Sequence, residues 1–191
     1  MIQTILNYLY RFFLLNNRKN IKLFGKVQVK NKPCIDIKDD ALLELGKNVT
    51  LNSKNEKYHL NMFTSVKLYA DRKGSKIKIG DNTRIHGSCL HAYEYIEIGK
   101  NCLIAANCQI FDGSGHDVYL KNASLRIKTI GKSKLIIIGD NCWIGTNCII
   151  LPGTILGNNC VIGAGSVVRG KFGNNLLISG NPAESIKSIE V

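Results

Sequence analysis

Aliphatic residues recur at every sixth position through the second half of this chain, and that period limits the possible folds more than any other feature. From Ile138 the sequence reads IGDNCW, IGTNCI, ILPGTI, LGNNCV, IGAGSV and VRGKFG. The same pattern returns upstream from Ile79 and Ile98, and a fainter copy begins at Leu45. Apolar residues lie about 3.6 positions apart on one face of a helix and two apart on a strand. A period of six therefore fits neither element alone.

A hexad is long enough for one short strand and one corner, and three hexads close one turn of a triangular coil. The leading aliphatic residue then points inward, and stacked coils hydrogen-bond as parallel strands about 4.8 Å apart. Asparagine and glycine crowd the corners because both tolerate positive φ. The repeat therefore predicts a parallel β-helix.

Small residues occupy the fifth position of most hexads, where a coil bends. Six of the seven cysteines are assigned to it: Cys89, Cys102, Cys108, Cys142, Cys148 and Cys160. Stacked cysteines suggest a metal or redox site, but nothing beside them completes a metal shell. We interpret them as small apolar residues that fill a narrow prism, with no metal bound. The absence of a CxxC pair and of a signal-peptide pattern indicates free thiols in a reducing cytoplasm.

Three motifs add to the repeats: WIG at Trp143–Gly145, GAGSVV at Gly163–Val168 and SGNPA at Ser179–Ala183. Over roughly residues 45–183 the chain resembles the hexapeptide-repeat acyltransferases. The closest subgroup is the maltose, galactoside and xenobiotic acetyltransferases with the bacterial polysaccharide O-acetyltransferases. The resemblance implies an all-β, left-handed parallel β-helix, an acetyl-CoA-dependent O-acetyltransferase without a covalent acyl-enzyme, and a homotrimer with active sites between subunits.

Three regions are expected. Residues 1–32 form an N-terminal amphipathic helix and a basic segment, residues 33–183 form the β-helix, and residues 184–191 form a C-terminal tail. The period breaks between Gly115 and Ile138, so we expect one loop excursion over residues 116–137. An excursion from a regular coil is a usual place for function.

His116 opens that excursion and falls where the resembling enzymes carry their catalytic histidine. An alcohol is a poor nucleophile at neutral pH, so a neutral imidazole must take its proton as attack begins. Asp112 and Asp117 flank His116, and either carboxylate could orient the ring. A solvated loop acid is an equally good interpretation of each.

The resemblance also implies a cofactor groove, residue by residue. Trp143 flanks the reactive end, Thr146 and Ala164 contact the pantetheine arm, and Gly145 and Gly163 belong to the wall. Arg169 falls where a Thr or Lys usually contacts the cofactor. Glu184 stands where the family carries a basic residue, so contact with the nucleotide phosphates falls to Lys187, Lys171 or Arg169.

The acceptor cannot be read from a motif. Galactoside and maltose enzymes bind sugar through Asn and Asp residues in the stretch that matches Ile85–Tyr93, where this chain has His86, His91 and Tyr93. We take these three as substrate-binding residues, and a simple galactoside or maltose acceptor is not expected. The expected acceptor is a sugar hydroxyl of a bacterial surface polysaccharide, such as capsule or O-antigen, or of its precursor.

Three other functions remain open. The same base and groove would serve N-acetylation of a nucleotide-linked amino sugar. A hexapeptide-repeat carbonic anhydrase would hold zinc on three histidines, but the spacing of His86, His91 and His116 runs in the wrong order. A non-catalytic scaffold is disfavoured by the WIG motif and the excursion.

The first half of the chain is strongly basic. Residues 1–80 hold 16 basic and 6 acidic residues, against 10 and 8 in residues 81–191. Apolar residues near the start, among them Ile2, Ile5 and Leu9, have helical spacing but form a segment too short to span a bilayer. The helix either lies on the inner membrane or packs on the β-helix, and we favour packing. No nucleic-acid recognition motif accompanies the charge.

Overall fold

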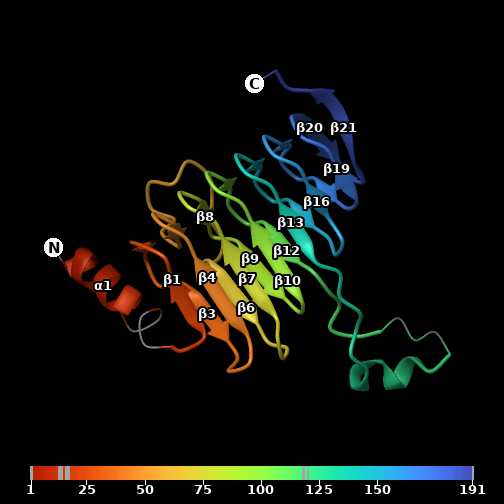
Figure 1. The fold of residues 1–191 in the computed structure, drawn as a ribbon, viewed down its shortest axis with the longest axis horizontal. Coiled ribbons are helices and arrows are strands. Elements are labelled where there is room, and N and C mark those ends of the chain that lie inside the picture. The colour runs from red at the N-terminus through yellow and green to blue at the C-terminus, as the bar shows by residue number, and fades with distance from the viewer. Residues whose placement is uncertain (1, 13–14, 16–17, 118, 120, 191) are drawn as a thin grey trace.

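The computed structural model describes residues 2–12, 15, 18–117, 119 and 121–190 (Figure 1). It is the predicted left-handed parallel β-helix, in which three sheets enclose a narrow core. Each of the first six coils contributes one strand to each of the three sheets, and the last coil contributes strands to sheets A and B. The strands of sheet A are β1 (Ile21–Leu23), β4 (Leu42–Leu45), β7 (Lys76–Ile79), β10 (Tyr95–Ile98), β13 (Ile136–Ile138), β16 (Ile155–Leu156) and β19 (Lys171–Phe172).

The other two sheets complete the prism. The strands of sheet B are β2 (Gln28–Lys30), β5 (Thr50–Asn52), β8 (Arg84–His86), β11 (Leu103–Ile104), β14 (Trp143–Ile144), β17 (Val161–Ile162), β20 (Leu176–Gly180) and β21 (Ala183–Ser188). The strands of sheet C are β3 (Cys34–Ile37), β6 (Lys67–Ala70), β9 (Cys89–Ala92), β12 (Gln109–Phe111), β15 (Ile149–Ile150) and β18 (Val167–Val168). The described strands pair in parallel except β21, which runs antiparallel to β20.

The hexad pattern is confirmed in the core. The leading residues from Ile138 to Val168 are buried, and so are five of the cysteines assigned to the fifth position. Each of those five thiols donates to a backbone carbonyl of the following coil, as Cys108 Sγ does to Gly145 O at 3.0 Å. They therefore fill the core as small buried residues.

The assignment of Cys89 to a buried position was wrong. Ile85 and Leu90 both point inward, so this corner is one residue shorter than the others. Ser88 therefore takes the buried position, where its hydroxyl donates to Ala105 O at 2.7 Å, and Cys89 turns partly outward.

Asparagines form a ladder along one corner of the prism. Asn82, Asn101 and Asn141 each have φ between 56° and 60°, a conformation that asparagine tolerates better than most residues. Their side-chain amides bond from coil to coil, with Asn82 Nδ2 donating to Asn101 Oδ1 and Asn101 Nδ2 to Asn141 Oδ1, both at 3.0 Å. Asn48, Asn159 and Asn175 continue the ladder at its ends.

The regular coils extend beyond their predicted limits. Strands β1 and β2 lie before residue 33 and pair with β4 and β5, so they form the first coil. At the other end, most of the expected tail lies in β21. The described chain leaves the coil twice, over residues 53–66 and 112–135, whereas the sequence predicted only the second excursion. The second excursion projects from the body and contains the 3-10 helix η2 (Ala123–Lys128) (Figure 1).

Helix α1 (Ile2–Arg11) covers the first-coil end of the β-helix (Figure 1). Tyr10 packs against the core, and the Asn31 N–H donates to Asn7 Oδ1 at 3.0 Å. Ile2 and Ile5 stay exposed, so one face of the helix packs on the coil and the other lies open. No described helix has the length and hydropathy needed to cross a bilayer.

Candidate active site

An apolar groove of about 330 Å³ runs along the outer face of sheet B over β11, β14 and β17. Its lining residues are Tyr58, His59, Leu60, Leu103, Ala105, Trp143, Gly145, Thr146, Val161, Ile162, Gly163 and Ala164. Trp143 is 51% exposed on this face, as its outward position in the hexad predicts. A Cβ on Gly145 would lie 2.6 Å from Ala164 N, so only glycine lets these two coils approach so closely.

Five of the seven residues predicted for the cofactor share this groove: Trp143, Gly145, Thr146, Gly163 and Ala164. Arg169 and Lys187 do not line it. Arg169 follows β18 in sheet C, Lys187 lies in β21, and both are exposed. A single chain therefore forms the wall expected for the acyl and pantetheine part, but leaves the two cations outside it.

His116 lies at a second groove, of about 450 Å³, which is lined also by Ser114, Asp117, Tyr119 and Lys132. This groove shares no lining residue with the apolar groove. The two are separate because the excursion leaves from β12 in sheet C, whereas the apolar groove lies on sheet B. Within one chain, the predicted base and the predicted cofactor wall belong to different faces of the prism.

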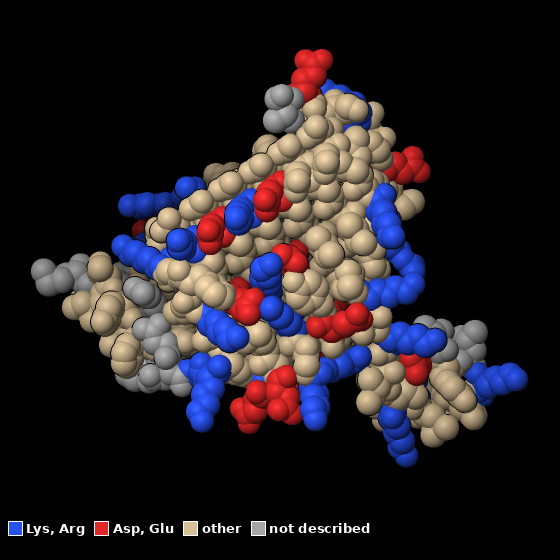
Figure 2. Space-filling view, viewed as in Figure 1, with Lys and Arg blue, Asp and Glu red and all other residues tan. Residues whose placement is uncertain are grey.

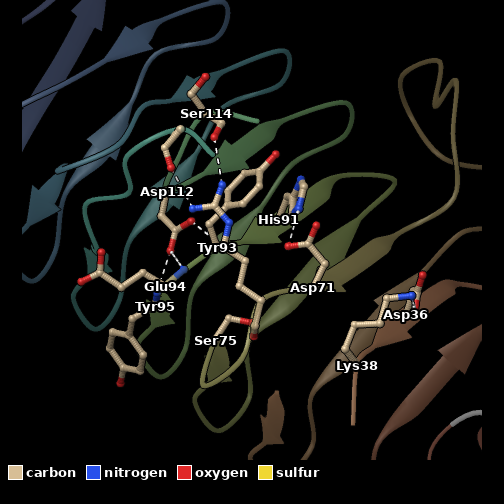
Figure 3. Close-up of polar contacts among 12 residues, drawn as sticks. Asp36, Lys38, Asp71, Ser75, His91, Tyr93, Glu94, Tyr95, Asp112 and Ser114 are labelled. Carbon is tan, nitrogen blue, oxygen red and sulfur yellow. Dashed lines mark hydrogen bonds and ion pairs between the residues drawn. The ribbon is translucent and has the colours of Figure 1, made fainter. Parts of the chain in front are cut away.

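Asp112 holds the corner from which the excursion leaves (Figure 3). Its buried carboxylate accepts the backbone N–H groups of Tyr93, Glu94 and Tyr95 at 2.6, 2.8 and 2.6 Å. Burial raises the pKa of this carboxyl, and the three N–H groups oppose that effect. Both carboxylate oxygens accept hydrogen bonds from the backbone of the preceding coil, and neither is bonded to His116. The structure therefore gives Asp112 a role in holding the backbone, which differs from its interpretation as an orienting carboxylate.

Arg72 ties the excursion to the body of the β-helix. Its guanidinium donates to Gly131 O at 2.9 Å and to Ser114 O at 3.1 Å, and lies 4.2 Å from the centroid of the Tyr93 ring. The Ser114 hydroxyl in turn donates to His116 O at 2.7 Å. Both ends of the excursion are thus fixed to one side chain, which sets where the segment that carries His116 begins.

His91 and Tyr93 lie on the outer side of sheet C beside this corner (Figure 3). Their ring centroids are 4.0 Å apart, and Tyr69 stacks on His91 from the other side at 4.4 Å. His91 Nε2 faces Asp71 Oδ1 at 3.4 Å. Burial lowers the pKa of His91, although the Asp71 carboxylate opposes this effect. His91 and Tyr93 therefore form an aromatic stack next to the excursion.

His86 is separated from the other two predicted substrate residues. It lies in β8 on sheet B, where Tyr58 stacks on it at 4.9 Å. Burial lowers its pKa to about 4, with Lys30, Arg84 and His59 acting in the same direction. The three predicted acceptor residues thus divide between two faces, with His86 next to the apolar groove and His91 with Tyr93 next to the His116 groove.

Sequence reasoning missed Tyr58, His59 and Arg72. Tyr58 and His59 lie in the excursion over residues 53–66, which Asn107 pins by accepting the Phe63 N–H at 2.9 Å and donating to Asn61 O at 2.9 Å. The loss of the hexad rhythm after Asn52 was the available signal for that excursion. In the part of the chain that the structure describes, no three His, Cys, Asp or Glu side chains are grouped to hold a metal ion.

A parallel β-helix of hexapeptide repeats with an apolar groove beside its glycine-rich corners is typical of the hexapeptide-repeat transferases. Comparison with known proteins gives the same class. Residues 136–170 match the family model described as bacterial transferase hexapeptide (six repeats), and residues 76–112 match the hexapeptide repeat of succinyl-transferase. WbbJ of Escherichia coli K12, which carries the provisional name of a lipopolysaccharide biosynthesis O-acetyl transferase, is 33% identical over 163 residues, or 81% of this chain and 76% of WbbJ.

Solved structures give the same result. A maltose O-acetyltransferase from Clostridium difficile 630 is 34% identical with a TM-score of 0.61, over 77% of this chain and 70% of that one. A galactoside acetyltransferase in complex with coenzyme A is 35% identical with a TM-score of 0.57, over 64% of this chain and 60% of that one. This chain belongs to the hexapeptide-repeat acyltransferases, and it is an acetyltransferase of that family.

Proposed function

We propose that this protein transfers an acetyl group from acetyl-CoA to a sugar hydroxyl of a bacterial surface polysaccharide, such as capsule or O-antigen, or of its precursor. The apolar groove on sheet B carries the proposal, because its lining includes five of the seven residues that the family resemblance assigns to the cofactor. The acceptor class is supported by the likeness to WbbJ and by the replacement of the expected Asn and Asp residues by His86, His91 and Tyr93.

In the proposed reaction, His116 acts as the general base. Its imidazole takes the proton of the acceptor hydroxyl while the oxygen attacks the thioester carbonyl. The C–O bond forms, the C–S bond breaks, and the proton passes from His116 to the departing thiolate of CoA. Asp117, beside His116 in the same groove, is proposed to orient the imidazole. No covalent acyl-enzyme is required.

The proposal includes a homotrimer with active sites between subunits. Its support is the separation of the two grooves on one chain, since His116 must reach a thioester bound beside Trp143. The excursion that carries His116 also projects from the body, and η2 contains no buried residue. We propose that the excursion of one subunit packs on its neighbour and brings His116 to the neighbour's apolar groove.

We further propose peripheral contact with the inner membrane through residues 1–32. Helix α1 exposes Ile2, Ile5 and Leu9, and cations of the first coil follow it in the sequence. Among described residues, Lys22 and Lys26 form no ion pair. An apolar helix face beside unpaired cations suits an anionic lipid surface, where lipid-linked glycan precursors would be at hand.

The test is thiol release from acetyl-CoA with a panel of capsular and lipopolysaccharide glycans. His116→Ala is expected to lower the rate about 100-fold or more, with unchanged oligomer size and melting temperature. The matched control is Lys128→Ala, which should leave the rate unchanged, because Lys128 is an exposed side chain of η2 in the same excursion and lines neither groove. A full rate in a folded His116→Ala variant would overturn the assignment of the base.

The product distinguishes the two acceptor classes. An O-acetyl ester is released by mild alkali, whereas an N-acetyl amide resists it. Alkali-stable acetate on a nucleotide-linked amino sugar would overturn O-transfer and establish the alternative activity.

A further inference from the structure

The outer face of sheet B changes character along the prism. The apolar groove covers β11, β14 and β17, whereas β2, β5 and β8 present polar and cationic side chains. A further groove lies over β2, β5 and β8 and is called the polar groove here. It has a volume of about 270 Å³ and is lined by Gln28, Lys30, Asn48, Thr50, Asn82, Arg84 and His86. Arg84 pairs in register with Leu103, which lines the apolar groove. These two residues lie on neighbouring strands, which are spaced about 4.8 Å apart, so the two grooves adjoin end to end.

The cations of the polar groove have no acidic partner. No carboxylate lines this groove, and neither Lys30 nor Arg84 forms an ion pair with any described residue. Sheet A differs, because Lys76 pairs with Glu44 at 2.8 Å and Lys78 with Glu97 at 2.7 Å. Figure 2 shows blue and red side chains interspersed on the face where β4, β7 and β10 lie. Two cations of sheet A are thus paired with carboxylates, whereas the two cations of the polar groove have no such partner among the described residues.

His86 adds a neutral N–H donor to the polar groove. The Asn52 amide is oriented by the Lys54 N–H, which donates to Asn52 Oδ1 at 3.0 Å. Asn52 Nδ2 is therefore the donor to His86 Nδ1, also at 3.0 Å. Because Nδ1 accepts this bond, the proton of the neutral imidazole lies on Nε2. The stacked ring of Tyr58 holds the imidazole in place. His86 is thus a donor and not a base, which suits recognition of a negatively charged oxygen.

We propose that the polar groove binds an acidic group of the acceptor, a sugar carboxylate or a phosphate, between Lys30 and Arg84. The inference rests on the proposed function, because the acceptor hydroxyl must reach an acetyl group held in the adjoining apolar groove. Arg84 supplies a planar guanidinium that matches carboxylate and phosphate oxygens, and Lys30 supplies a second charge. The amide of Gln28, which also lines the groove, suits a neighbouring sugar hydroxyl. The acceptor class is thereby narrowed to anionic glycans and their phosphate-bearing precursors.

Binding is measured by titration calorimetry on the full chain without acetyl-CoA. The probes are a hyaluronan tetrasaccharide for the carboxylate, UDP-N-acetylglucosamine for the phosphate, and chitotetraose as the neutral control. At least one acidic probe is expected to bind about tenfold tighter than chitotetraose, and its affinity should fall as NaCl rises from about 50 to about 300 mM. The preferred acidic probe identifies which source of negative charge the groove takes.

Variants place that binding in the polar groove. Arg84→Gln and Lys30→Gln should each weaken the acidic probe about tenfold and leave chitotetraose unchanged. Arg84→Lys, which keeps the charge, should restore part of the loss. Lys22→Gln is the matched control, because Lys22 is an exposed cation on the outer face of sheet A. Equal affinity for acidic and neutral probes, or acidic binding that survives both groove variants, would overturn the proposal.

Failure of the proposed function would look different. Trp143 is the only tryptophan of the chain and lines the apolar groove, so its fluorescence reports acetyl-CoA independently of the probes. Loss of acetyl-CoA binding with intact acidic-probe binding would remove the transfer reaction and leave the polar groove as an anion site. Intact transfer to neutral glycans alone, without acidic binding, would remove only this inference.

Discussion

The structural role of Asp112 differs from the one that its place in the sequence suggests. It lies four residues before His116, yet its carboxylate serves the backbone of residues 93–95 in the preceding coil. A corner in which three N–H groups converge on one buried carboxylate stabilises the departure point of the excursion. The residue therefore acts on His116 only through the backbone.

Replacing Asp112 by alanine is expected to lower the free energy of unfolding by about 2–4 kcal/mol, because three backbone N–H groups lose the buried carboxylate that accepts their hydrogen bonds. Chemical denaturation measures this loss. Asp117→Ala in the same loop is the control and should change stability by about 0.5 kcal/mol or less, as for a surface residue. An Asp112→Ala protein as stable as the wild type would contradict the assigned role.

His86 makes stability depend on pH. Its pKa falls from an ordinary 6.5 to about 4 in the folded chain, so the unfolded chain binds the proton more readily. Stability is therefore complete above pH 6.5 and declines as the pH falls toward 4. The loss is on the order of 1–2 kcal/mol after allowance for the partial exposure of the ring. Thermal unfolding between these pH values should show a flatter dependence for His86→Gln than for the wild type, and identical curves would contradict the assignment.

At the scale of elements, the asparagine ladder joins coils that share only short strands. Asn101 receives one amide bond and donates another, whereas Asn175 only receives one, from Asn159. Both residues have φ near 57°, so a glycine substitution adds no strain and tests the amide alone.

Asn101→Gly is expected to cost about 1–2 kcal/mol and Asn175→Gly about half of that, because each amide bond contributes about 1 kcal/mol or less at an exposed site. Chemical denaturation of the two variants gives the comparison. A larger cost for the terminal position would contradict a ladder of coupled amides.

The elements also mark where sequence reasoning stops. The hexad rhythm predicted the coils, the inward residues and most buried cysteines, because strand and corner repeat locally. It misplaced Cys89, since a corner shortened by one residue leaves the following pattern almost unchanged. It missed Tyr58 and His59, because an irregular excursion has no period to read. Arg72 is 42 residues from Ser114 in the sequence, and only the stacked coils bring them together.

At the scale of the whole molecule, the sequence predicted that the residues proposed for the cofactor lie together. They belong to two motifs at fixed hexad positions on one sheet, so the motifs alone place them side by side. In the proposed trimer, the position of His116 relative to that groove depends on how copies of the chain pack, which no local sequence pattern describes.

The excursion tests that assembly. Ile127 and Ile130 are 76% and 74% exposed on the excursion over residues 112–135, and we expect a neighbouring subunit to cover them. Ile127→Asp with Ile130→Asp should shift the protein from trimer to monomer in analytical ultracentrifugation and abolish transfer. Ile186→Asp on β21 is the control. This side chain is likewise exposed, at 60%, but lies several coils away from the excursion. A wild-type monomer with full activity would refute the trimer.

The antiparallel strand β21 affects whether the β-helix can associate end to end with other molecules. A stack of parallel coils is a template that could add further coils, or further molecules, without limit, as fibrils do. Helix α1 covers the first coil, and β21 presents an antiparallel edge at the last. Each terminal element therefore obstructs the addition of a further coil at its end of the stack. We expect loss of β21 to leave most inward contacts of the prism intact and to expose the edge of β20, so its hazard is association of chains rather than unfolding.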